Sequence, residues 1–340
     1  MVPWSEDHMK FLVTGGAGYI GSHCALSLLE KGNDVVVFDN LSVGHIETVE
    51  TLKGIGGDRF AFVKGDLMAP ETLDRMFSEH SIDCVFHFAA FSQVGESINK
   101  PAKYYRNNVT GTMNLLDSMV AHDVKRIVFS STAAVYGEPE YTPIDENHPK
   151  QPINPYGTTK LTIERMLDDY DRAYGLKSVR LRYFNVVGAD AKCRVGEWHE
   201  PETHLVPNIL KAAGKESASF SLFGDDYPTR DGTCVRDYIN VEDLVDAHVL
   251  AYDYLAKGGD TNFFNLGTAN GQTVLEIFDT CRKVTAAPIN VEKKGRRAGD
   301  PAVLIANSDK ARSVLGWEPK RSLEDSISSA YEWEKKRRSA

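Results

Sequence analysis

Residues 11–21 read FLVTGGAGYIG, and this motif indicates the fold class. Phe11–Val13 is a short apolar run of the kind that forms a buried strand. The pattern from Ile20 to Lys31 predicts an amphipathic helix, and the apolar run Val35–Phe38 predicts a second buried strand. A glycine turn that joins a strand to a helix, with another strand after it, is the setting of a dinucleotide-binding fingerprint.

The glycines of this turn are spaced G-x-x-G-x-x-G. We expect Gly15 to permit the tight turn, Gly18 to let the backbone approach a pyrophosphate, and Gly21 to let the helix pack against the strand. The helix N-terminus then offers N–H groups to the phosphates. Asp39 ends the second strand, where a carboxylate can bind the ribose hydroxyls of adenosine and repel a 2′-phosphate. No arginine follows directly, so the sequence predicts NAD rather than NADP.

Strand and helix patterns keep alternating after the fingerprint. Further strands are predicted at residues 60–63, 84–88, 127–130 and 179–182, with helices at 70–80, at 102–121 and around residues 156–174. Such alternation predicts an α/β fold of the Rossmann type, a doubly wound parallel sheet with helices on both faces. Ligands of these sheets bind beyond the carboxyl ends of the strands. Asp66, Phe88, Ala89, Ser130–Thr132 and Phe184-Asn185 fall at such ends, so we expect them around one crevice.

The second half of the chain is less regular. It predicts helices at 205–213, 241–256, 274–285, 308–315 and 323–337, and a strand at 263–266. We infer a smaller α/β domain for the substrate, made of discontinuous segments. The predicted division gives residues 9–186 and 235–268 to the NAD-binding domain, 187–234 and 269–340 to the substrate domain, and 1–8 to a loosely ordered extension.

Composition narrows the class of protein. The chain has 340 residues, 42% of them hydrophobic, and a net charge of −9, which argues against nucleic acid as the main partner. No apolar run approaches the ~20 residues of a membrane span, and the N-terminus does not resemble a signal peptide. Five scattered cysteines suggest free thiols in a reducing compartment, and hence the cytoplasm. No metal is expected, because none of the ten histidines has another His or Cys three or four residues away on a plausible helix.

Tyr156 and Lys160 stand one helical turn apart, in PYGTTK, and so share a helix face. A phenol with a pKa near ~10 is a poor base at neutral pH, and a nearby ammonium favours its ionised form. The spacing alone is common in proteins. It gains weight from the nucleotide loop upstream and from Ser130-Ser131-Thr132, whose hydroxyls end the fifth strand and can face Tyr156 across the crevice. A strand-end turn stabilised by local Ser and Thr hydrogen bonds is the other interpretation of that stretch.

These motifs resemble those of the extended short-chain dehydrogenase/reductases, and within them the UDP-glucose 4-epimerases, from Lys10 to the last helix. The resemblance rests on the glycine loop, Tyr156/Lys160 and the blocks Asp39–Leu41, His87–Ala90, Val94–Ser97, Ser130–Gly137, Arg182–Asn185, Gly224–Thr233 and Val235–Ile239. It implies tightly bound NAD and reversible C4 epimerisation of UDP-galactose and UDP-glucose through a 4-keto sugar, as in galactose metabolism. It also implies a homodimer that pairs through residues 102–121 and 156–174.

The resemblance assigns roles residue by residue. The implied catalytic residues are Tyr156, Lys160 and Thr132. The implied cofactor site comprises Gly15, Gly18, Tyr19, Ile20, Asp39, Asn40, Asp66, Leu67, Phe88, Ala89, Ala90, Asn107, Ser130, Tyr156, Lys160 and Tyr183. The implied substrate site comprises Thr132, Tyr156, Phe184, Asn185, His204, Leu205, Phe220, Leu222, Phe223, Arg236, Tyr238, Arg297, Asp300 and Leu304. Arg236 and Arg297 are expected to neutralise the diphosphate, because a guanidinium binds phosphate oxygens in pairs.

Three departures from the family pattern carry information. Thr132 stands where serine is usual, and His204 where asparagine is frequent. Family members restricted to glucose and galactose have tyrosine at the position of Leu304. Members that accept N-acetylated sugars have smaller residues there. Leucine is intermediate in size, so some activity on UDP-N-acetylglucosamine and UDP-N-acetylgalactosamine is expected.

Three other functions compete with this interpretation of the sequence. A sugar-nucleotide 4,6-dehydratase needs an Asp-Glu pair after the threonine, where this chain has Ala133-Ala134. An epimerase for UDP-glucuronate or another UDP-sugar is harder to separate, although Ala133 and the Gly224–Thr233 block favour the neutral sugar. A non-catalytic NAD-sensing protein on the same fold is disfavoured by the intact Tyr156 and Lys160.

Overall fold

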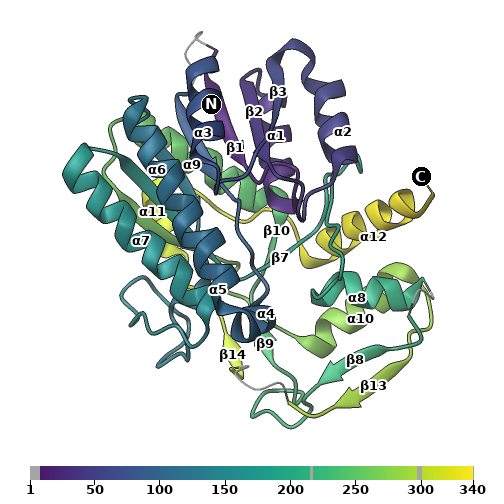
Figure 1. Cartoon of the computed structure of the whole chain (residues 1–340). Coiled ribbons are helices and arrows are strands. Elements are labelled where there is room, and N and C mark those ends of the chain that lie inside the picture. The colour runs from purple at the N-terminus through teal and green to yellow at the C-terminus, as the bar shows by residue number, and fades with distance from the viewer. Residues whose placement is uncertain (1–7, 215–216, 297–300, 340) are drawn as a thin grey trace.

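The structure, a computed structural model, describes residues 8–214, 217–296 and 301–339. At its centre lies a seven-stranded sheet with the strand order β11-β6-β5-β4-β1-β2-β3, and every pair in it is parallel (Figure 1). The strands are β1 (Lys10–Thr14), β2 (Asp34–Asp39), β3 (Phe60–Lys64), β4 (Cys84–His87), β5 (Arg126–Ser130), β6 (Lys177–Tyr183) and β11 (Asn262–Leu266). The predicted Rossmann-type fold class is confirmed.

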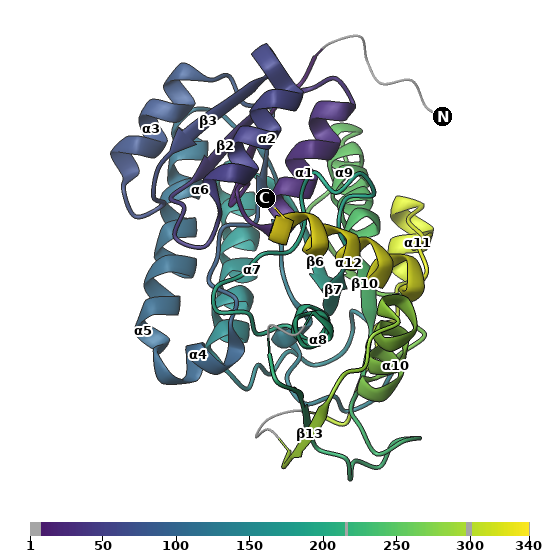
Figure 2. The same ribbon diagram turned by 90° about the vertical axis from the view of Figure 1, so that its right-hand side faces the viewer.

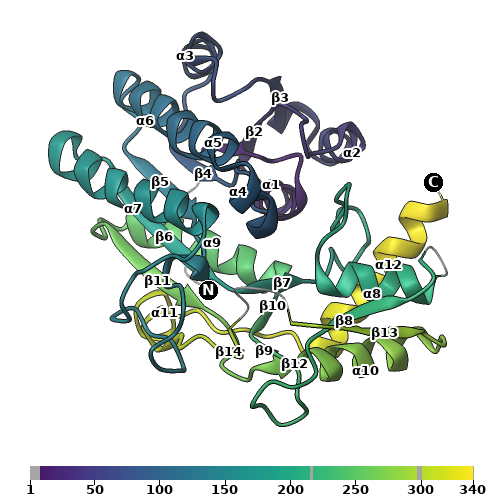
Figure 3. The ribbon, with the colours of Figure 1, turned by 60° about the horizontal axis from the view of Figure 1, so that its bottom comes forward.

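Helices cover both faces of this sheet, as its continuous apolar strands require. One hydrophobic core joins the sheet to α1 (Tyr19–Glu30), α2 (Ile46–Gly56), α9 (Val241–Ala256) and α11 (Asp309–Leu315). A second core joins the other face to α3 (Pro70–Glu79), α6 (Gly111–Ala121) and α7 (Pro155–Tyr174). Figure 3 shows α6 and α7 on one side of the sheet and α9 on the other.

The remaining elements lie beyond the carboxyl ends of the strands and around them. A third core joins α8 (Leu205–Ala213), β8 (Phe220–Phe223), α10 (Val274–Thr285) and α12 (Leu323–Ser339). β8 pairs in parallel with β13 (Val291–Lys294), and in Figure 2 this pair lies at the opposite end of the molecule from β3 and α3. The smaller ladders are formed by β7 (Asn185–Val187) with β10 (Tyr238–Asn240), and by β9 (Val235–Arg236) between β12 (Gln272–Thr273) and β14 (Val303–Leu304).

The predicted helix 102–121 is wrong in detail. It consists of α5 (Pro101–Tyr104), a π-helical stretch η2 (Tyr105–Thr110) and α6. Wider π turns occur mostly at functional sites, and this one carries Asn107 and Asn108. The sequence analysis did not predict α2, α4 (Val94–Asn99) or the 3₁₀ turns η1 (Gly57–Arg59) and η3 (Ala133–Val135).

The division into two domains stays a prediction. One element bears on its boundary: α11, which the prediction gives to the substrate domain, packs on the central sheet, because Ala311, Leu315 and Trp317 belong to the first core. Of the predicted N-terminal extension, residues 1–7 lie outside the described residues, and His8 Nδ1 lies 2.9 Å from the carbonyl oxygen of Gly32.

All five cysteines are free thiols. No helix in the described ranges is long and apolar enough to span a membrane.

Candidate active site

A cavity of about 1020 Å³ lies at the carboxyl ends of the central strands. It runs from the glycine loop past Tyr156 and Lys160 to β8, β9 and the start of α8, so it contacts both the sheet and the third core. This is where ligands of doubly wound sheets bind.

The glycine loop forms one wall of the cavity because two of its glycines admit no side chain. Gly15 has φ of +72°, and a Cβ there would lie 2.7 Å from the backbone nitrogen of Ala89. A Cβ on Gly21 would lie 2.2 Å from the carbonyl oxygen of Gly15. The loop therefore turns tightly, and α1 begins directly against it. Within the described residues, no side chain caps the N-terminus of α1, which leaves its first N–H groups for a ligand.

Asp39 lies at the end of β2 beside this loop. Its carboxylate accepts hydrogen bonds from the backbone N–H groups of Ala17 (3.1 Å) and Leu41 (2.8 Å). Burial raises the pKa of the carboxyl, and the two hydrogen bonds oppose that rise. Asn40 donates to Asp66 (2.9 Å), which joins the ends of β2 and β3 at the cavity wall.

Tyr156 occupies the first turn of α7. The turn is fixed by Asn154, whose side chain accepts a hydrogen bond from Gly157 N (2.9 Å), and by Pro155 at the first helical position. Tyr156 and Lys160 both line the cavity. Thr132 lies opposite, where its side chain hydrogen-bonds with Tyr156 and caps η3 by accepting from Ala134 N (3.1 Å).

The electrostatics of the pair differ from the prediction. Burial raises the pKa of Tyr156 to about 12, and only the hydrogen bond with Thr132 opposes the rise. Burial also lowers the pKa of Lys160 to about 7, against the attraction of Glu164. The protein alone therefore does not show the lowered phenol pKa that the spacing suggests, because desolvation is the largest influence on it. Lys160 Nζ instead donates to the carbonyl oxygen of Ser130 (2.8 Å) and lies 6.0 Å from the Tyr156 ring centroid.

A buried polar network supports α7 from beneath. Arg182 on β6 donates through Nε (2.8 Å) and Nη2 (2.5 Å) to the two carboxylate oxygens of Glu164. Ser131 donates to the same carboxylate (2.6 Å), and Arg182 donates to Tyr136 (2.8 Å). This network fixes the helix of Tyr156 and Lys160 against the strand-end segment that carries Thr132.

Most predicted site residues meet in this cavity. Every described member of the predicted cofactor site lines it, as do Thr132, Phe184, Asn185, His204, Leu205, Phe220, Phe223, Arg236 and Tyr238. Two predicted substrate residues do not line it. Leu222 is buried in the third core, and Leu304 packs beside Phe184 in a small core under Tyr136 and Leu161. Arg297 and Asp300 lie outside the described residues.

Individual contacts refine these placements. Tyr183 and Ser130 share a short hydrogen bond between their hydroxyls at the ends of β5 and β6. Asn107 donates to Asn108 (3.0 Å), and Asn108 in turn ties η2 to α7 through Thr159 (3.2 Å). Nη1 of Arg236 donates to the backbone carbonyls of Val235 (2.9 Å) and Pro301 (2.8 Å), which fixes the guanidinium at the cavity wall.

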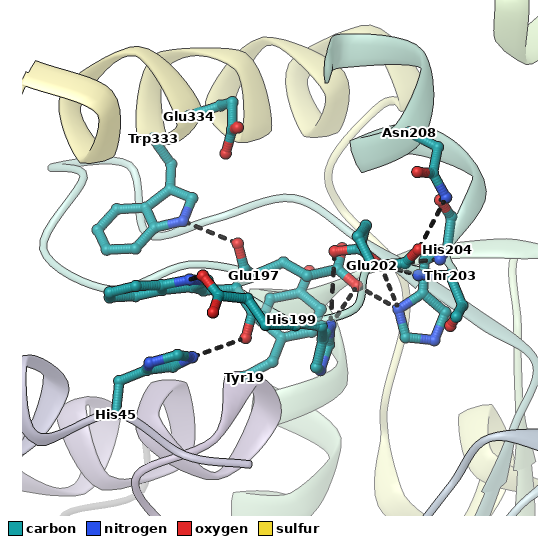
Figure 4. Close-up of polar contacts among 12 residues, drawn as sticks. Tyr19, His45, Glu197, His199, Glu202, Thr203, His204, Asn208, Trp333 and Glu334 are labelled. Carbon is teal, nitrogen blue, oxygen red and sulfur yellow. Dashed lines mark hydrogen bonds and ion pairs between the residues drawn. The ribbon is translucent and has the colours of Figure 1, made fainter. Parts of the chain in front are cut away.

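The sequence analysis missed a cluster on the loop before α8. Glu197, His199, Glu202 and His204 offer ligand atoms that all lie within 4.8 Å of one another. All four line the cavity. Figure 4 shows their side chains and the contacts among them. Histidine spacing was considered only for helices, whereas these residues lie on a loop and the two histidines are five positions apart. The pattern E-x-H-x-x-E-x-H in residues 197–204 was the available signal.

The residues present fit a dinucleotide. One cavity holds three features of a dinucleotide site. They are the uncapped N-terminus of α1, the space beside Gly15 that a Cβ would fill, and the carboxylate of Asp39 at the end of β2. They would hold the pyrophosphate and the adenosine ribose of NAD.

The comparisons with known proteins agree with this geometry. A family model described as GDP-mannose 4,6 dehydratase matches residues 12–330. A UDP-glucose 4-epimerase of Halalkalibacterium halodurans is 52% identical over 328 residues, covering 96% of each chain. A UDP-glucose 4-epimerase of Bifidobacterium longum, solved with NAD+ and UDP, is 40% identical with a TM-score of 0.92, covering 96% of this chain and 98% of that one. A UDP-Glc/GlcNAc 4-epimerase of Campylobacter jejuni is 41% identical with a TM-score of 0.84, covering 96% and 99%.

The family model spans the central sheet and most of the third core, and the similar proteins span nearly the whole chain. The chain belongs to the UDP-glucose 4-epimerase family of the extended short-chain dehydrogenase/reductases.

Proposed function

We propose that this protein is an NAD-dependent isomerase that interconverts UDP-glucose and UDP-galactose by reversible epimerisation at C4. The observation that carries the proposal is the meeting of Tyr156, Lys160 and Thr132 with the glycine loop and Asp39 in one cavity. When bound, NAD supplies a hydride acceptor that returns the hydride to the same sugar carbon. The chain's own residues bind the sugar nucleotide and move the proton.

In this proposal Tyr156 accepts the proton of the sugar 4-hydroxyl and gives it back to the 4-keto oxygen. Thr132 hydrogen-bonds with the phenol and orients it toward that oxygen. The phenol must lose its proton in a site where burial holds its pKa at about 12, so a positive charge beyond that of Lys160 has to act on it. The nicotinamide ring of NAD carries such a charge, which ties deprotonation to cofactor occupancy.

The other end of the substrate would be held while the sugar turns. Arg236 and Asn185 line the cavity on β9 and β7, and we assign them to the diphosphate. Phe220, Phe223 and Leu205 offer apolar walls on β8 and α8, which suit the uracil end. Binding energy from the nucleotide would keep the 4-keto sugar in the cavity while it presents its other face.

The decisive experiment is a coupled assay that follows the conversion of UDP-galactose to UDP-glucose by the purified protein without added NAD. We expect turnover, because tightly bound NAD would copurify with the protein. A protein that binds NAD yet leaves the ratio of the two sugars unchanged would contradict the proposal and favour the NAD-sensing alternative.

We also propose activity on UDP-N-acetylglucosamine and UDP-N-acetylgalactosamine. Leu304 does not line the cavity, but it pairs in register with Arg236 and packs against the same small core as Phe184. Arg236 and Phe184 both line the cavity. The side chain at position 304 can therefore shape the sugar pocket from behind. The Campylobacter jejuni relative, named for both sugars, supports the proposal. Leu304→Tyr should lower kcat/KM for the N-acetylated sugars more than for UDP-galactose; no measurable turnover of an N-acetylated sugar by the unsubstituted enzyme would contradict the proposal.

A homodimer through η2, α6 and α7 is a further proposal. Figure 1 shows α6 and α7 side by side at one edge of the molecule, and Tyr105, Met113 and Tyr174 expose more than 40% of their surface there. Met113→Glu should then halve the mass measured by light scattering. The control Val314→Glu, on the opposite face, should not change it.

We place the protein in the cytoplasm, as the five free thiols suggest. Fractionation of cells that express the untagged chain would test this location, and recovery in a membrane or secreted fraction would contradict it.

A further inference from the structure

We propose that Glu197, His199, Glu202 and His204 form a binding site for one divalent transition-metal ion, of which zinc is the best match. The four residues lie on the loop that joins β7 to α8, in the wall of the cavity. This inference is independent of the catalytic proposal, because its tests measure the metal and not the turnover.

The donor atoms are already spaced for a metal ion. His199 Nδ1 lies 3.4 Å from Glu197 Oε1 and 3.7 Å from Glu202 Oε2, and His204 Nδ1 lies 3.5 Å from Glu202 Oε1. Tetrahedral zinc with bonds of about 2.0–2.1 Å separates neighbouring ligand atoms by roughly 3.4 Å. Only the contact of His204 Nδ1 with Glu197 Oε1, at 2.6 Å, is a direct hydrogen bond that a metal would have to replace.

The charges of the cluster are compatible with a cation, which would take the place of the histidine protons. The carboxylates of Glu197 and Glu202 are only 7% and 3% exposed. Within the described ranges, their ion pairs are formed with the two histidines alone, and no lysine or arginine takes part. Two buried carboxylates this close repel each other unless positive charge stands between them.

His199 supplies a second, independent observation. Its Nδ1 atom is buried and has no hydrogen-bond partner, although it faces both carboxylates. Buried polar atoms almost always make a hydrogen bond, so an imidazole nitrogen that makes only longer ion pairs with two carboxylates calls for an explanation. A metal ion between the three groups would satisfy all of them. Two imidazole nitrogens with two carboxylate oxygens form a donor set that zinc accepts.

The loop that carries these donors is held from both sides (Figure 4). Trp333 on α12 donates from Nε1 to the carbonyl oxygen of Glu197 (3.0 Å). The ring of His45 stacks on Trp198 at 3.6 Å, and its Nε2 lies 3.2 Å from the Trp198 carbonyl oxygen. The edge-on contact of Tyr19 with His199, at 6.4 Å between centroids, joins the cluster to the glycine loop.

A site fixed in this way loses little conformational entropy when an ion binds. Four protein ligands fill a tetrahedral shell, which is the arrangement of structural rather than catalytic zinc. The ion would fix the loop before α8, which Trp333 joins to α12 and Tyr19 joins to the start of α1. Without the ion, the same four residues form carboxylate–histidinium ion pairs. The experiments below distinguish the metal-bound state from this ion-paired state.

The first test measures zinc binding to the untagged, full-length protein after treatment with a chelator. Competition with a chromophoric chelator should give one zinc per chain with a Kd below about 1 μM. Zinc should also raise the Tm. His204→Asn and His199→Gln should each weaken binding at least tenfold and abolish the Tm rise. His204 is half-exposed, so its replacement should leave the protein folded, which the Tm without zinc will show.

A matched control and a spectroscopic readout complete the test. His122→Gln removes a histidine that pairs with Asp74 on the surface (2.7 Å) and should bind zinc like the parent protein. Cobalt(II) in place of zinc should give the visible absorption bands of tetrahedral coordination in the parent and in His122→Gln, but not in His204→Asn. The proposal is overturned if the parent protein binds no zinc at micromolar concentration, or if both cluster variants bind it as tightly as the parent.

Discussion

Tyr156 shows how strongly burial acts on a single side chain. Its helical spacing from Lys160 suggests a phenol made acidic by an ammonium, yet both groups are buried and both pKa values move toward the neutral forms. Both groups therefore favour their neutral forms more than they would in water, and positive charge brought by a ligand would favour the phenolate.

The first prediction concerns this hydroxyl. Tyr156→Phe should lower kcat for UDP-galactose by about 10²–10⁴, because the ring still packs but no longer moves a proton. NAD content, measured by release and absorbance, should stay near the parent level. Tyr141→Phe, an exposed tyrosine, is the matched control and should keep full turnover. Full turnover by Tyr156→Phe would mean that another group is the base.

Asp39 determines the second prediction, the choice of cofactor. Asp39→Ser should weaken NAD binding and raise the relative affinity for NADP by about tenfold or more, because the carboxylate no longer repels a 2′-phosphate. Asp34→Ser, at the other end of the same strand, should leave the ratio unchanged. The measurement is the Kd of each cofactor for protein stripped of NAD. An unchanged ratio in Asp39→Ser would remove Asp39 from the ribose site.

At the scale of elements, capping made several boundaries predictable. α9 and α10 begin where the sequence predicts, because Asn240 accepts from Glu242 N (2.8 Å) and Thr273 and Glu276 form a capping box. The hydrophobic period fixes the rest of each helix. The π-helical stretch η2 was not predictable, since a 3.6-residue period carries no sign of one wider turn. The parallel pair β8–β13 was missed because its partners are about 70 residues apart and β13 is charged and exposed.

The glycine turn gives the third prediction. Gly21→Ala puts a Cβ 2.2 Å from the Gly15 carbonyl oxygen, so α1 must move away from β1. We expect a loss of about 1–3 kcal/mol in the free energy of unfolding and a marked loss of bound NAD. Gly54→Ala in α2 meets no atom within 4 Å and should be neutral or stabilising by about 0.5–1 kcal/mol. Urea unfolding and NAD content measure both effects. Equal behaviour of the two variants would refute the packing argument.

At the scale of the whole molecule, one cavity draws on segments from nearly the entire chain. The strand-end part of its lining, such as Asp66, Phe88 and Ser130, was predictable from the sequence, because strand ends are recognisable and meet at one edge of a parallel sheet. The lining on β8, β9 and α8 was expected only from the family resemblance. The Glu197–His204 cluster was not predicted, because the path of an irregular loop is set by distant residues such as Trp333 and His45. The place of Leu304 behind the cavity was missed for the same reason: β14 is only two residues long and its position depends on pairing with β9.

The buried pair Glu164–Arg182 joins two layers of the molecule and gives the fourth prediction. Glu164→Gln leaves the guanidinium of Arg182 buried without its carboxylate, which should cost about 3–5 kcal/mol of stability. Asp169→Asn breaks an exposed pair with Arg172 on the same helix and should change stability by less than about 1 kcal/mol. Urea midpoints compare the two. A loss below about 1 kcal/mol in Glu164→Gln would show that water reaches the network in solution.

The fifth prediction is the acid sensitivity of the fold. Burial lowers the pKa values of His23 and His248 to about 4, and burial together with Lys160 lowers that of His87 to about 3. In the unfolded chain these groups titrate near ~6.5, so between pH 6.5 and about 4 the unfolded state binds more protons. Stability should therefore fall on acidification through this window, by up to about 1.4 kcal/mol per pH unit for each histidine.

His199 affects the pH dependence of stability in the opposite direction and limits the stable pH range on the alkaline side. Burial lowers its pKa, but Glu197 and Glu202 outweigh that effect and raise it to about 9. The protonated His199 contributes fully to the free energy of unfolding below pH 6.5, and this contribution is lost as the pH rises toward 9. Stability should therefore be greatest near neutrality. Urea midpoints from pH 4.5 to 9 test both limbs. His248→Met should reduce the loss of stability at acid pH by up to the effect of one proton and leave the loss at alkaline pH unchanged. His199→Gln should reduce the loss at alkaline pH. If neither variant alters the dependence of stability on pH, that dependence comes from other groups.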